Sequence, residues 1–440
     1  RPGEPVALGA RGGWCWYEED RVLVDGDAVL IGTIASPSGD VQVTRWDLGD
    51  GRAQTAVLHA ALQSDDHASP ALLRLPDGRY LASYAAHVDN DPRHPDDHLM
   101  RWRRTLRPGD VSAWEPERRL SVRAAVSYTN LIRLSAEGGR IYNFHRGVGF
   151  DPNWLVSYDD GQTFSYGGRL LHGVPIPGAP GSGRPYVRYA SDGGDTVHIV
   201  TTDDHPRHRD NSLWHGYLRG GVLYRSDATP IGPLPEGPRG GYTPDQLTQV
   251  VAGSPDDVAW TSDLAVDASG RPVVTWSSQR GDADKTHERG GGGMDLRYGW
   301  ARWEGDRWQV EAIGYAGTRL YAPEVDYAGL VAIDRADPEV VYASTNADPA
   351  TGEPLRSAAD GQRHWELWRG ARGRPGEPWS WTPLTHDSAV DNLRPVARDA
   401  GPRGTVVIWL RGAYRTYVDY DLEVVGVVLP RGAPPAPAPR

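Results

Sequence analysis

The sequence predicts an all-β protein, a seven-bladed β-propeller made of four-stranded antiparallel blades. Three observations predict it: a repeated pair of apolar runs, a composition that favours strands and turns, and one Asp-box. The 440-residue chain contains 53 Gly, 36 Pro, 17 Trp and 20 Tyr, but 3 Phe and 2 Met. Gly and Pro are typical of tight turns and Trp and Tyr of strands, so short strands are favoured over helices.

The repeat consists of an apolar run, a turn rich in Gly, Asp or Pro, and a second apolar run. Seven second runs begin 51 to 76 residues apart. One interval accommodates a four-stranded blade with its loops, and such sheets protect their edges by packing radially. The second runs are residues 29–34, 80–87, 141–146, 197–202, 273–277, 340–344 and 406–411.

The Asp-box is independent support for a propeller. Residues 157–164 have its spacing, with Ser157, Asp159, Gly161 and Thr163 followed by an aromatic residue. The carboxylate and hydroxyl groups of such a motif satisfy the backbone of a tight hairpin turn. We therefore give it a structural and not a catalytic role.

Residues 1–430 are expected to form a single propeller, the catalytic domain, and residues 431–440 a disordered tail rich in Pro and Ala. Two long interruptions, 216–261 and 282–294, are predicted to be extended loops. Long loops on a rigid scaffold are where binding specificity usually lies.

The formal charge of −11 argues against binding to nucleic acid or to an anionic membrane surface, although a locally positive site could still take an acidic ligand. No apolar run is long enough to span a membrane. The single cysteine, Cys15, excludes an intrachain disulfide. A start without Met or a signal-peptide core predicts a secreted protein whose signal peptide has been removed. We expect it to be a monomer.

Polar residues recur at one position of the repeat. In a propeller, residues just before the first inner run, or ending the second, collect at one mouth of the central funnel. This set is more polar than core packing requires. Before the first runs lie His67, Tyr128, Tyr186, Asp263 and Arg394, and ending the second runs lie His87 and Arg146.

Such a set suits β-elimination beside a uronic acid. The reaction needs a cation on the carboxylate, a base for the C5 proton and an acid for the departing O4. Arg pairs with a carboxylate through two hydrogen bonds, and His and Tyr exchange protons within hydrogen-bond reach. Arg146, His67 and Tyr128 match these roles, and no cofactor or metal is required.

Each of these residues also has a structural interpretation when taken alone. His67 could be a turn histidine bonded to an Asp, Tyr128 and Tyr186 core hydroxyls, and Arg146 a salt-bridge partner of a neighbouring blade. Their shared repeat position favours a site. A further histidine cluster has spacing that permits a metal site, although a solvated loop is favoured, and contains His205, His208 and His215.

The chain resembles the BNR-repeat polysaccharide lyases, among them ulvan lyases and lyases that cut rhamnose from glucuronic acid. The similarity runs from about residue 13 to residue 425 in the same order. The motifs that carry it are Gly13-Trp14-Cys15-Trp16-Tyr17, Asp65-Asp66-His67-Ala68-Ser69-Pro70, Ser127-Tyr128-Thr129-Asn130, Arg184-Pro185-Tyr186-Val187-Arg188-Tyr189-Ala190, Thr202-Asp203-Asp204-His205-Pro206 and Asp391-Asn392-Leu393-Arg394-Pro395.

The resemblance implies a seven-bladed propeller and metal-independent elimination at a 4-linked glucuronic or iduronic acid, usually next to rhamnose. It implies that His67 and His87 are a histidine pair at the mouth, Tyr128 a catalytic tyrosine, Arg146 the carboxylate-neutralising arginine and Tyr186 a substrate contact. Further substrate-binding candidates are Arg188, Asp263, Arg394 and Asn130.

One departure concerns metal. Some relatives carry a structural zinc held by histidines and a cysteine in the region of His205 and His215, whereas the only cysteine here is Cys15. Zinc is therefore not expected, and His205 and His215 are kept only as weak metal candidates.

These observations predict a secreted polysaccharide lyase that acts on an acidic polymer such as ulvan or the rhamnosyl-glucuronate ends of plant gums. Tyr128 and His67 would share the base and acid roles, with His87 binding or polarising beside them. Two alternatives remain. One is a sialidase-like hydrolase, for which Arg146, Arg394 and Glu324 are candidates although no arginine triad is evident; the other is a non-catalytic glycan-binding propeller.

Overall fold

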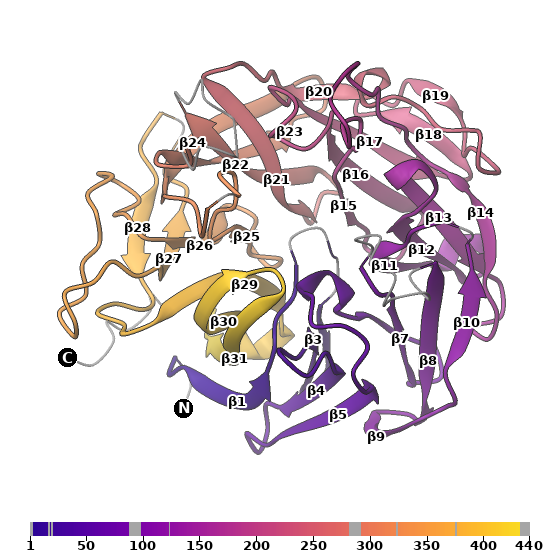
Figure 1. Cartoon of the computed structure of the whole chain (residues 1–440), viewed down its shortest axis with the longest axis horizontal. Coiled ribbons are helices and arrows are strands. Elements are labelled where there is room, and N and C mark those ends of the chain that lie inside the picture. Colours follow the sequence, from indigo (N-terminus) through magenta and orange to yellow (C-terminus); the bar gives the residue numbers. More distant parts are fainter. Residues whose placement is uncertain are drawn as a thin grey trace.

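The computed structural model describes residues 3–15, 18, 21–87, 98–122, 124–280, 292–322, 324–374 and 376–431. Within these ranges the chain forms seven antiparallel sheets around a central axis, which confirms the predicted seven-bladed propeller (Figure 1). The helices among these residues are short 3-10 turns, and none has the length and apolar character that a membrane span requires.

The blades follow the chain in order, and the first strand of each lies nearest the axis (Figure 1). The first three blades consist of β2 (Val22–Asp25), β3 (Ala28–Ile34), β4 (Val41–Asp47) and β5 (Ala53–His59); β6 (Ala71–Arg74), β7 (Tyr80–Tyr84), β8 (Leu99–Arg107), β9 (Asp110–Trp114) and β10 (Arg118–Ser121); and β11 (Ser127–Leu134), β12 (Arg140–Arg146), β13 (Pro152–Ser157) and β14 (Ser165–Arg169).

The next three blades consist of β15 (Val187–Ala190), β16 (Thr196–Thr202), β17 (Leu213–Arg219), β18 (Val222–Arg225), β19 (Pro230–Pro233) and β20 (Thr248–Val251); β21 (Asp257–Val266), β22 (Pro272–Arg280), β23 (Leu296–Trp303) and β24 (Trp308–Gly317); and β25 (Val331–Ile333), β26 (Val340–Thr345), β27 (Glu366–Ala371) and β28 (Ser380–Pro383). The 3-10 turns are η1 (Asp66–Ala68), η2 (Ser135–Glu137), η3 (Val148–Phe150), η4 (Pro244–Gln246) and η6 (Gly401–Arg403).

The last blade joins the two ends of the described chain. It consists of β29 (Asp391–Asp399), β30 (Thr405–Thr416), β31 (Asp419–Leu429) and the N-terminal strand β1 (Val6–Arg11). Strand β1 pairs antiparallel with β31, with Val6 opposite Gly426. This pairing closes the ring through backbone hydrogen bonds instead of a covalent link.

The apolar core lies between neighbouring blades. Phe144 of β12 stacks on Tyr189 of β15, with 4.6 Å between ring centroids, and Trp300 and Trp409 are fully buried in later blades. Because each blade buries its face against the next, the innermost strands are held rigidly around the axis.

The Asp-box forms the turn between β13 and β14, as predicted. The Asp159 carboxylate accepts hydrogen bonds from the backbone N–H of Thr163 at 2.8 Å and from the Thr163 hydroxyl at 2.7 Å. The Ser157 hydroxyl accepts one from the N–H of Gly161 at 2.9 Å. All three side chains are used by the turn itself.

The prediction of a long loop over residues 216–261 is wrong. This segment contributes the additional strands β18, β19 and β20, which extend the fourth blade to six strands. Strand β19 begins and ends with proline, which is tolerated there because β19 lies at a sheet edge. Most of the second predicted loop, residues 282–291, and the tail residues 432–440 lie outside the described residues.

Ring closure through β1 leads to a stability prediction. Leu8 is 4% exposed in β1, whereas Val6 in the same strand is 38% exposed. Leu8→Ala should lower the free energy of unfolding by about 2–4 kcal/mol, because it leaves a cavity against β31. Val6→Ala is the matched control and should change it by less than about 0.5 kcal/mol. Denaturant unfolding measures both, and equal effects would contradict a closure that depends on buried β1 side chains.

Candidate active site

One mouth of the funnel gathers five of the seven residues that the repeat position predicted. In each hairpin the start of the first strand and the end of the second lie at the same end of the blade. His67 precedes β6, His87 follows β7, Tyr128 lies at the start of β11, Arg146 ends β12, and Tyr186 precedes β15. The Tyr128 ring centroid lies 5.1 Å from that of His67 and 6.2 Å from that of Tyr186.

The two histidines form a stacked pair on a single carboxylate. Their rings are parallel within 2°, with centroids 3.9 Å apart. Asp65 Oδ1 lies 2.7 Å from His67 Nδ1, and Asp65 Oδ2 lies 2.7 Å from His87 Nδ1. An ionised carboxylate only accepts hydrogen bonds, so both Nδ1 atoms carry protons, and Asp65 fixes the orientation of both rings.

The two rings differ in charge. Burial opposes a charge on His67, but Coulombic attraction to Cys15 and Tyr128, where these are ionised, and to the Asp65 carboxylate raises the pKa of His67 well above its usual value. At neutral pH, where the Cys15 thiol and the Tyr128 phenol are protonated, the carboxylates of Asp65 and Asp66 are the charges that favour a proton on His67. Burial lowers the pKa of His87 to about 4, and the charged His67 ring adds to this shift despite the Asp65 contact. At neutral pH, His67 is therefore an imidazolium, and His87 a neutral imidazole with a lone pair on Nε2.

A second carboxylate explains why the charge resides on His67. Asp66 Oδ1 lies 3.0 Å from His67 Nδ1. Burial would raise the pKa of Asp66, but Arg394 and His67 lower it, so Asp66 is ionised. His67 thus contacts two carboxylates, whereas His87 contacts one.

A β-bulge aims the Tyr128 side chain. The register of β11 and β12 shifts between Ser127 and Asn130, and Tyr128 has a left-handed φ of 59°. Such a conformation is unfavourable for a bulky residue and is often found at functional sites. Burial raises the pKa of Tyr128 well above 10, so its phenol is protonated at neutral pH.

Arg146 lies over the Tyr128 ring. Its guanidinium carbon is 4.4 Å from the ring centroid, and its Nε donates a hydrogen bond of 2.9 Å to the Ser127 hydroxyl. A small cavity of about 20 Å³ is lined in part by Tyr128, Arg146 and Tyr186. A cation, a phenol and a second tyrosine therefore meet at one opening.

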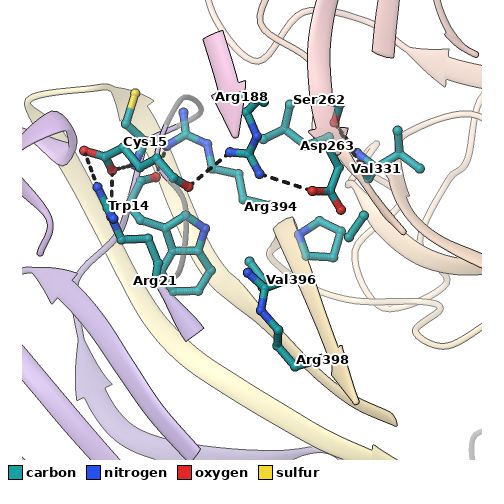
Figure 2. Close-up of a pocket in the computed structure, with 14 residues that line it drawn as sticks. Trp14, Cys15, Arg21, Arg188, Ser262, Asp263, Val331, Arg394, Val396 and Arg398 are labelled. Atoms are coloured by element: carbon teal, nitrogen blue, oxygen red, sulfur yellow. Dashed lines mark hydrogen bonds and ion pairs between the residues drawn. The ribbon is translucent and has the colours of Figure 1, made fainter. Parts of the chain in front are cut away.

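Three predicted substrate-binding residues lie in the axial channel instead of at this opening. Arg188, Asp263 and Arg394 line a cavity of about 30 Å³ between the inner strands (Figure 2). Arg188 pairs with Asp263 at 3.3 Å, and Asp263 also pairs with Arg335 at 2.8 Å. Burial would raise the pKa of Asp263, but Arg335 and Arg188 lower it to about 2.

Arg394 holds the segment that carries His67 in place through an ion pair with Asp66. Its Nη1 atom lies 2.6 Å from Asp66 Oδ2, and its Nη2 atom donates a hydrogen bond of 2.8 Å to the Tyr414 hydroxyl. It sits in a bulge of β29 with a φ of 52°, as Tyr128 does in β11. Its described contacts are thus with the protein itself.

Asn130 has a similar internal role. Its side-chain amide donates hydrogen bonds to the backbone oxygens of Tyr128 at 2.7 Å and Phe144 at 3.1 Å. These contacts hold the bulge that carries Tyr128. The structure therefore places Asn130 behind the site.

The two weak metal candidates do not meet. His205 contacts Arg207, which forms a two-pronged pair with Glu324 at 2.8 and 2.9 Å. His215 is buried in the fourth blade and hydrogen-bonds to His198 at 3.1 Å. Burial lowers the pKa of His215 well below its usual value. Among the described residues, His205 and His215 belong to no common group of metal-ligating side chains.

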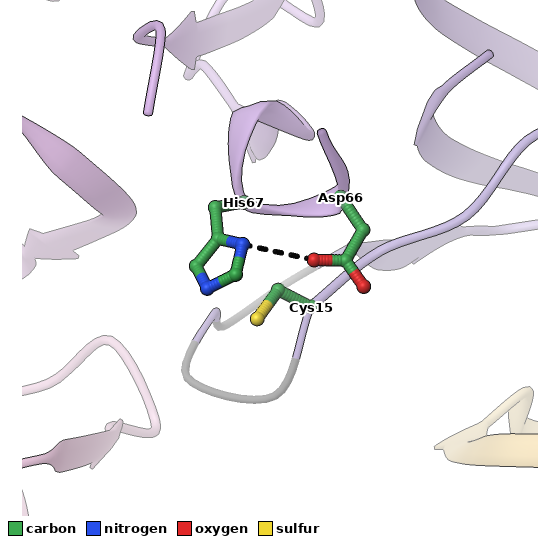
Figure 3. A group of neighbouring side chains, drawn as sticks. All are labelled: Cys15, Asp66 and His67. Atoms are coloured by element: carbon green, nitrogen blue, oxygen red, sulfur yellow. Dashed lines mark ion pairs between the residues drawn. The ribbon is translucent and has the colours of Figure 1, made fainter. Parts of the chain in front are cut away.

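Cys15 lies beside the histidine pair. Its thiol, Asp66 and His67 are close enough to form a potential ligand group (Figure 3). Asp66 already accepts hydrogen bonds from Arg394 and Tyr414, and His67 Nδ1 donates to Asp65. Burial raises the pKa of Cys15, which disfavours the thiolate that a metal would need.

Sequence reasoning gave no role to several residues that shape this site. Asp65 is the most important, since two Asp before a histidine also fit an exposed turn. Tyr417 follows β30 and packs edge-on against His67 and His87, with centroids 5.2 and 6.0 Å away. It lies several residues beyond the apolar run 406–411, so the self-alignment of the runs did not reach it.

An arc of aromatic rings continues around the mouth from Tyr128. Each ring centroid lies about 5.5 to 6.2 Å from the next. These rings are largely buried, with Trp260 only 1% exposed, so they pack mostly edge to face on one another and hold the inner ends of the blades together. In order around the arc, the residues are Tyr128, Tyr186, Trp260, Tyr327, Tyr321 and Tyr414.

Chemically, the mouth combines three functions within a few ångströms. Arg146 offers a permanent cation, His87 a neutral base oriented by a carboxylate, and Tyr128 a protonated phenol. This is the set of groups needed to bind an acidic ligand and to move a proton from one atom of it to another.

The family follows from the sequence profile. The BNR repeat-containing family matches residues 15–315, and the chain belongs to it. No curated protein matches the chain at a significant level.

Solved structures of polysaccharide lyases share this fold. A family PL25 ulvan lyase superposes with a TM-score of 0.67 at 16% identity, covering 97% of this chain and 96% of that one. A PL25 ulvan lyase bound to -[GlcA(1-4)Rha3S]- gives 0.65 at 15% identity, covering 97% and 96%. The polysaccharide lyase Uly1 gives 0.56 at 10% identity, covering 96% and 94%. At these identities the similarity establishes the fold.

The shared carboxylate leads to a prediction about protonation. Asp65→Asn should lower the pKa of His67, because an amide cannot stabilise the imidazolium as a carboxylate does. Titration of the ring nitrogens by NMR measures this. His145, whose pKa of about 4 is set mainly by burial, is an internal control that should not move. An unchanged His67 titration in a folded variant would contradict the assignment of its charge to Asp65.

Proposed function

We propose that this protein is a polysaccharide lyase that cleaves an acidic polymer by β-elimination at a 4-linked glucuronic or iduronic acid next to rhamnose. One observation carries the proposal: a buried arginine without a carboxylate partner among the described residues faces a neutral histidine and a protonated tyrosine. The similar folds of the ulvan lyases support it, and so does the glucuronate–rhamnose ligand of one of them. Since a polymer of this kind does not enter cells, we also propose that the protein acts outside them.

The first step is recognition of the carboxylate. Arg146 pairs with the uronate, and the imidazolium of His67 adds positive charge nearby. Neutralising the carboxylate acidifies the C5 proton, because the negative charge that develops when the proton leaves is delocalised onto the carboxylate oxygens.

The second step moves the proton and breaks the chain. His87 Nε2 takes the C5 proton, and the electron pair of the C5–H bond forms a double bond between C4 and C5. The C4–O4 bond breaks, and Tyr128 donates its phenolic proton to the departing O4. Return of the proton from His87 to Tyr128 through solvent completes the cycle.

This scheme differs from the role expected for His67 from the sequence. A base must be unprotonated at the working pH, which suits His87 with its pKa of about 4 and not the imidazolium of His67. Asp65 orients the ring of His87 from the far side, as a carboxylate orients the histidine of a catalytic triad.

The two alternatives have less support. The arginines proposed for a hydrolase do not converge, because Arg394 is occupied by Asp66, and Glu324 is occupied by Arg207. A protein that only binds glycans transfers no proton, so it would not need a neutral His87 beside the oriented phenol of Tyr128. No observation favours either over the lyase.

Tyr128→Phe tests the mechanism. The variant should still bind substrate but lose about 10²–10⁴-fold in kcat, because the leaving oxygen no longer receives a proton. Ulvan, gum arabic, heparinoids and pectic polymers are digested, and the ultraviolet absorbance of the new double bond is followed. Tyr158→Phe, on a side chain 71% exposed in the Asp-box turn, is the control and should be fully active. Reducing ends that rise without this absorbance would indicate hydrolysis and refute the proposal.

The pH dependence tests the base. The kcat/KM profile should be flat around neutral pH and fall as the pH drops through about 4, where His87 becomes protonated. An acid limb near the ordinary histidine pKa of about 6.5 would contradict His87 as the base.

Stability must be separated from this effect. Burial lowers the pKa of His145 and His198 to about 4, so between that pH and about 6.5 the folded state binds fewer protons than the unfolded state. Stability is therefore lost as the pH falls through this window. Activity recovered on return to neutral pH distinguishes titration of His87 from unfolding.

A further inference from the structure

We propose that Arg184 forms, beside Arg146, a subsite for a second anionic group of the polymer, a sulfate ester or the carboxylate of a second uronic acid. The inference rests on the proposed function, because it assumes that Arg146 holds the uronate that is cleaved. The subsite would make efficient cleavage depend on a second negative charge on the polymer, at a position next to the uronate that is cleaved.

Both arginines contact one aromatic ring. The guanidinium carbon of Arg184 lies 4.9 Å from the Phe150 ring centroid, and that of Arg146 lies 6.0 Å from it. Each contact is a favourable cation–π interaction. The ring thus connects two like charges, whose mutual repulsion an anion between or beside them would relieve.

Neither guanidinium has a carboxylate partner among the residues that the structure describes. Three other arginines around the axis and mouth differ in this respect. Their pairs are Arg394 with Asp66 at 2.6 Å, Arg188 with Asp263 at 3.3 Å and Arg207 with Glu324 at 2.8 Å. Arg146 and Arg184 are therefore two described cations of the site whose charge is left for a ligand.

The backbone holds Phe150 in an unfavourable conformation. Phe150 has a left-handed φ of 59° at the end of η3, and its N–H donates to Gly147 O at 2.9 Å. The next residue, Asp151, is anchored by the Gly173 N–H at 3.0 Å and by Arg169 at 3.1 Å. Strain of this kind in an aromatic residue persists where the surroundings enforce it, and it commonly marks a ligand site.

Arg184 is anchored at its backbone only. Its N–H donates to the buried Asp204 Oδ1 at 3.0 Å, and the Gly183 N–H donates to Asp204 Oδ2 at 2.6 Å. Pro185 then leads directly to Tyr186 at the opening. The base of the side chain is fixed, while its five N–H donors remain available for the planar, two-pronged contact that guanidinium makes with sulfate or carboxylate.

The test compares Arg184→Ala on three substrates: ulvan, chemically desulfated ulvan, and an unsulfated oligosaccharide with a single uronate. Losing a charge-assisted contact should reduce kcat/KM about tenfold or more, mainly through KM. A reduction confined to native ulvan identifies sulfate. A reduction on both polymers but not on the single-uronate oligosaccharide identifies a second carboxylate.

Two further variants sharpen the comparison. Arg184→Lys keeps the positive charge but not the planar, two-pronged guanidinium. Its kcat/KM should lie between those of wild type and Arg184→Ala. Arg219→Ala is the matched control, because Arg219 also lies over an aromatic ring, 5.2 Å from Tyr217, but pairs with Asp195 at 3.4 Å. Arg219→Ala should leave kcat/KM unchanged on all three substrates.

Two outcomes would overturn the subsite: an equal reduction on all three substrates, or no reduction on any. Failure of the proposed function is distinguishable, since wild type would then form no unsaturated product from any of them. In that case, calorimetry tests the subsite by comparing how tightly wild type and Arg184→Ala bind native and desulfated ulvan. Equal affinities of the two proteins for both polymers would refute the subsite.

Discussion

The candidate site depends on one buried carboxylate shared by two stacked imidazoles. Asp65 is 1% exposed, and an ionised group so placed requires a compensating charge. His67 supplies it, because His67 also contacts Asp66. The charge on His67 then suppresses a second proton on His87, whose ring is 3.9 Å away. The shared carboxylate of Asp65, together with Asp66 on one side, therefore makes two identical side chains chemically different, a cation and a neutral base.

The propeller presents this pair to its partners through repeated backbone geometry. Every blade brings the start of its first strand and the end of its second to the same mouth, so residues distant in sequence meet without long loops. Bulges in β11 and β29 turn Tyr128 and Arg394 toward the axis, both with left-handed φ. Tyr128 thus faces the histidines, while Arg394 supports them through Asp66. Interblade packing holds these strands, so little reorganisation is needed when a ligand binds.

The blades, the Asp-box turn and the gathering of His67, His87, Tyr128 and Arg146 could be predicted because they follow from a repeat visible in the sequence. The charges of the site residues could not be predicted from the sequence. Which histidine carries the proton depends on burial and on the distance to Asp66, and these arise only when the chain closes. Likewise, self-alignment placed Asp263 and Arg394 near the axis, but their ion pairs involve residues of other blades. Residues 216–261 looked like a loop because proline-rich edge strands lack an alternating apolar pattern.

Charge balance at the mouth accounts for an acidic protein that would bind an acidic polymer. The charges of Asp65 and His67 cancel, as do those of Asp66 with Arg394 and of Glu324 with Arg207, while His87 and Tyr128 are neutral. Among the described residues at the opening, Arg146 and Arg184 remain without a carboxylate partner, so these residues leave a local positive surplus although the whole chain carries −11. Fields inside a cleft are focused by its low-dielectric walls, whereas surface charge is screened within about 10 Å. The local surplus, and not the total, therefore decides which ligand enters.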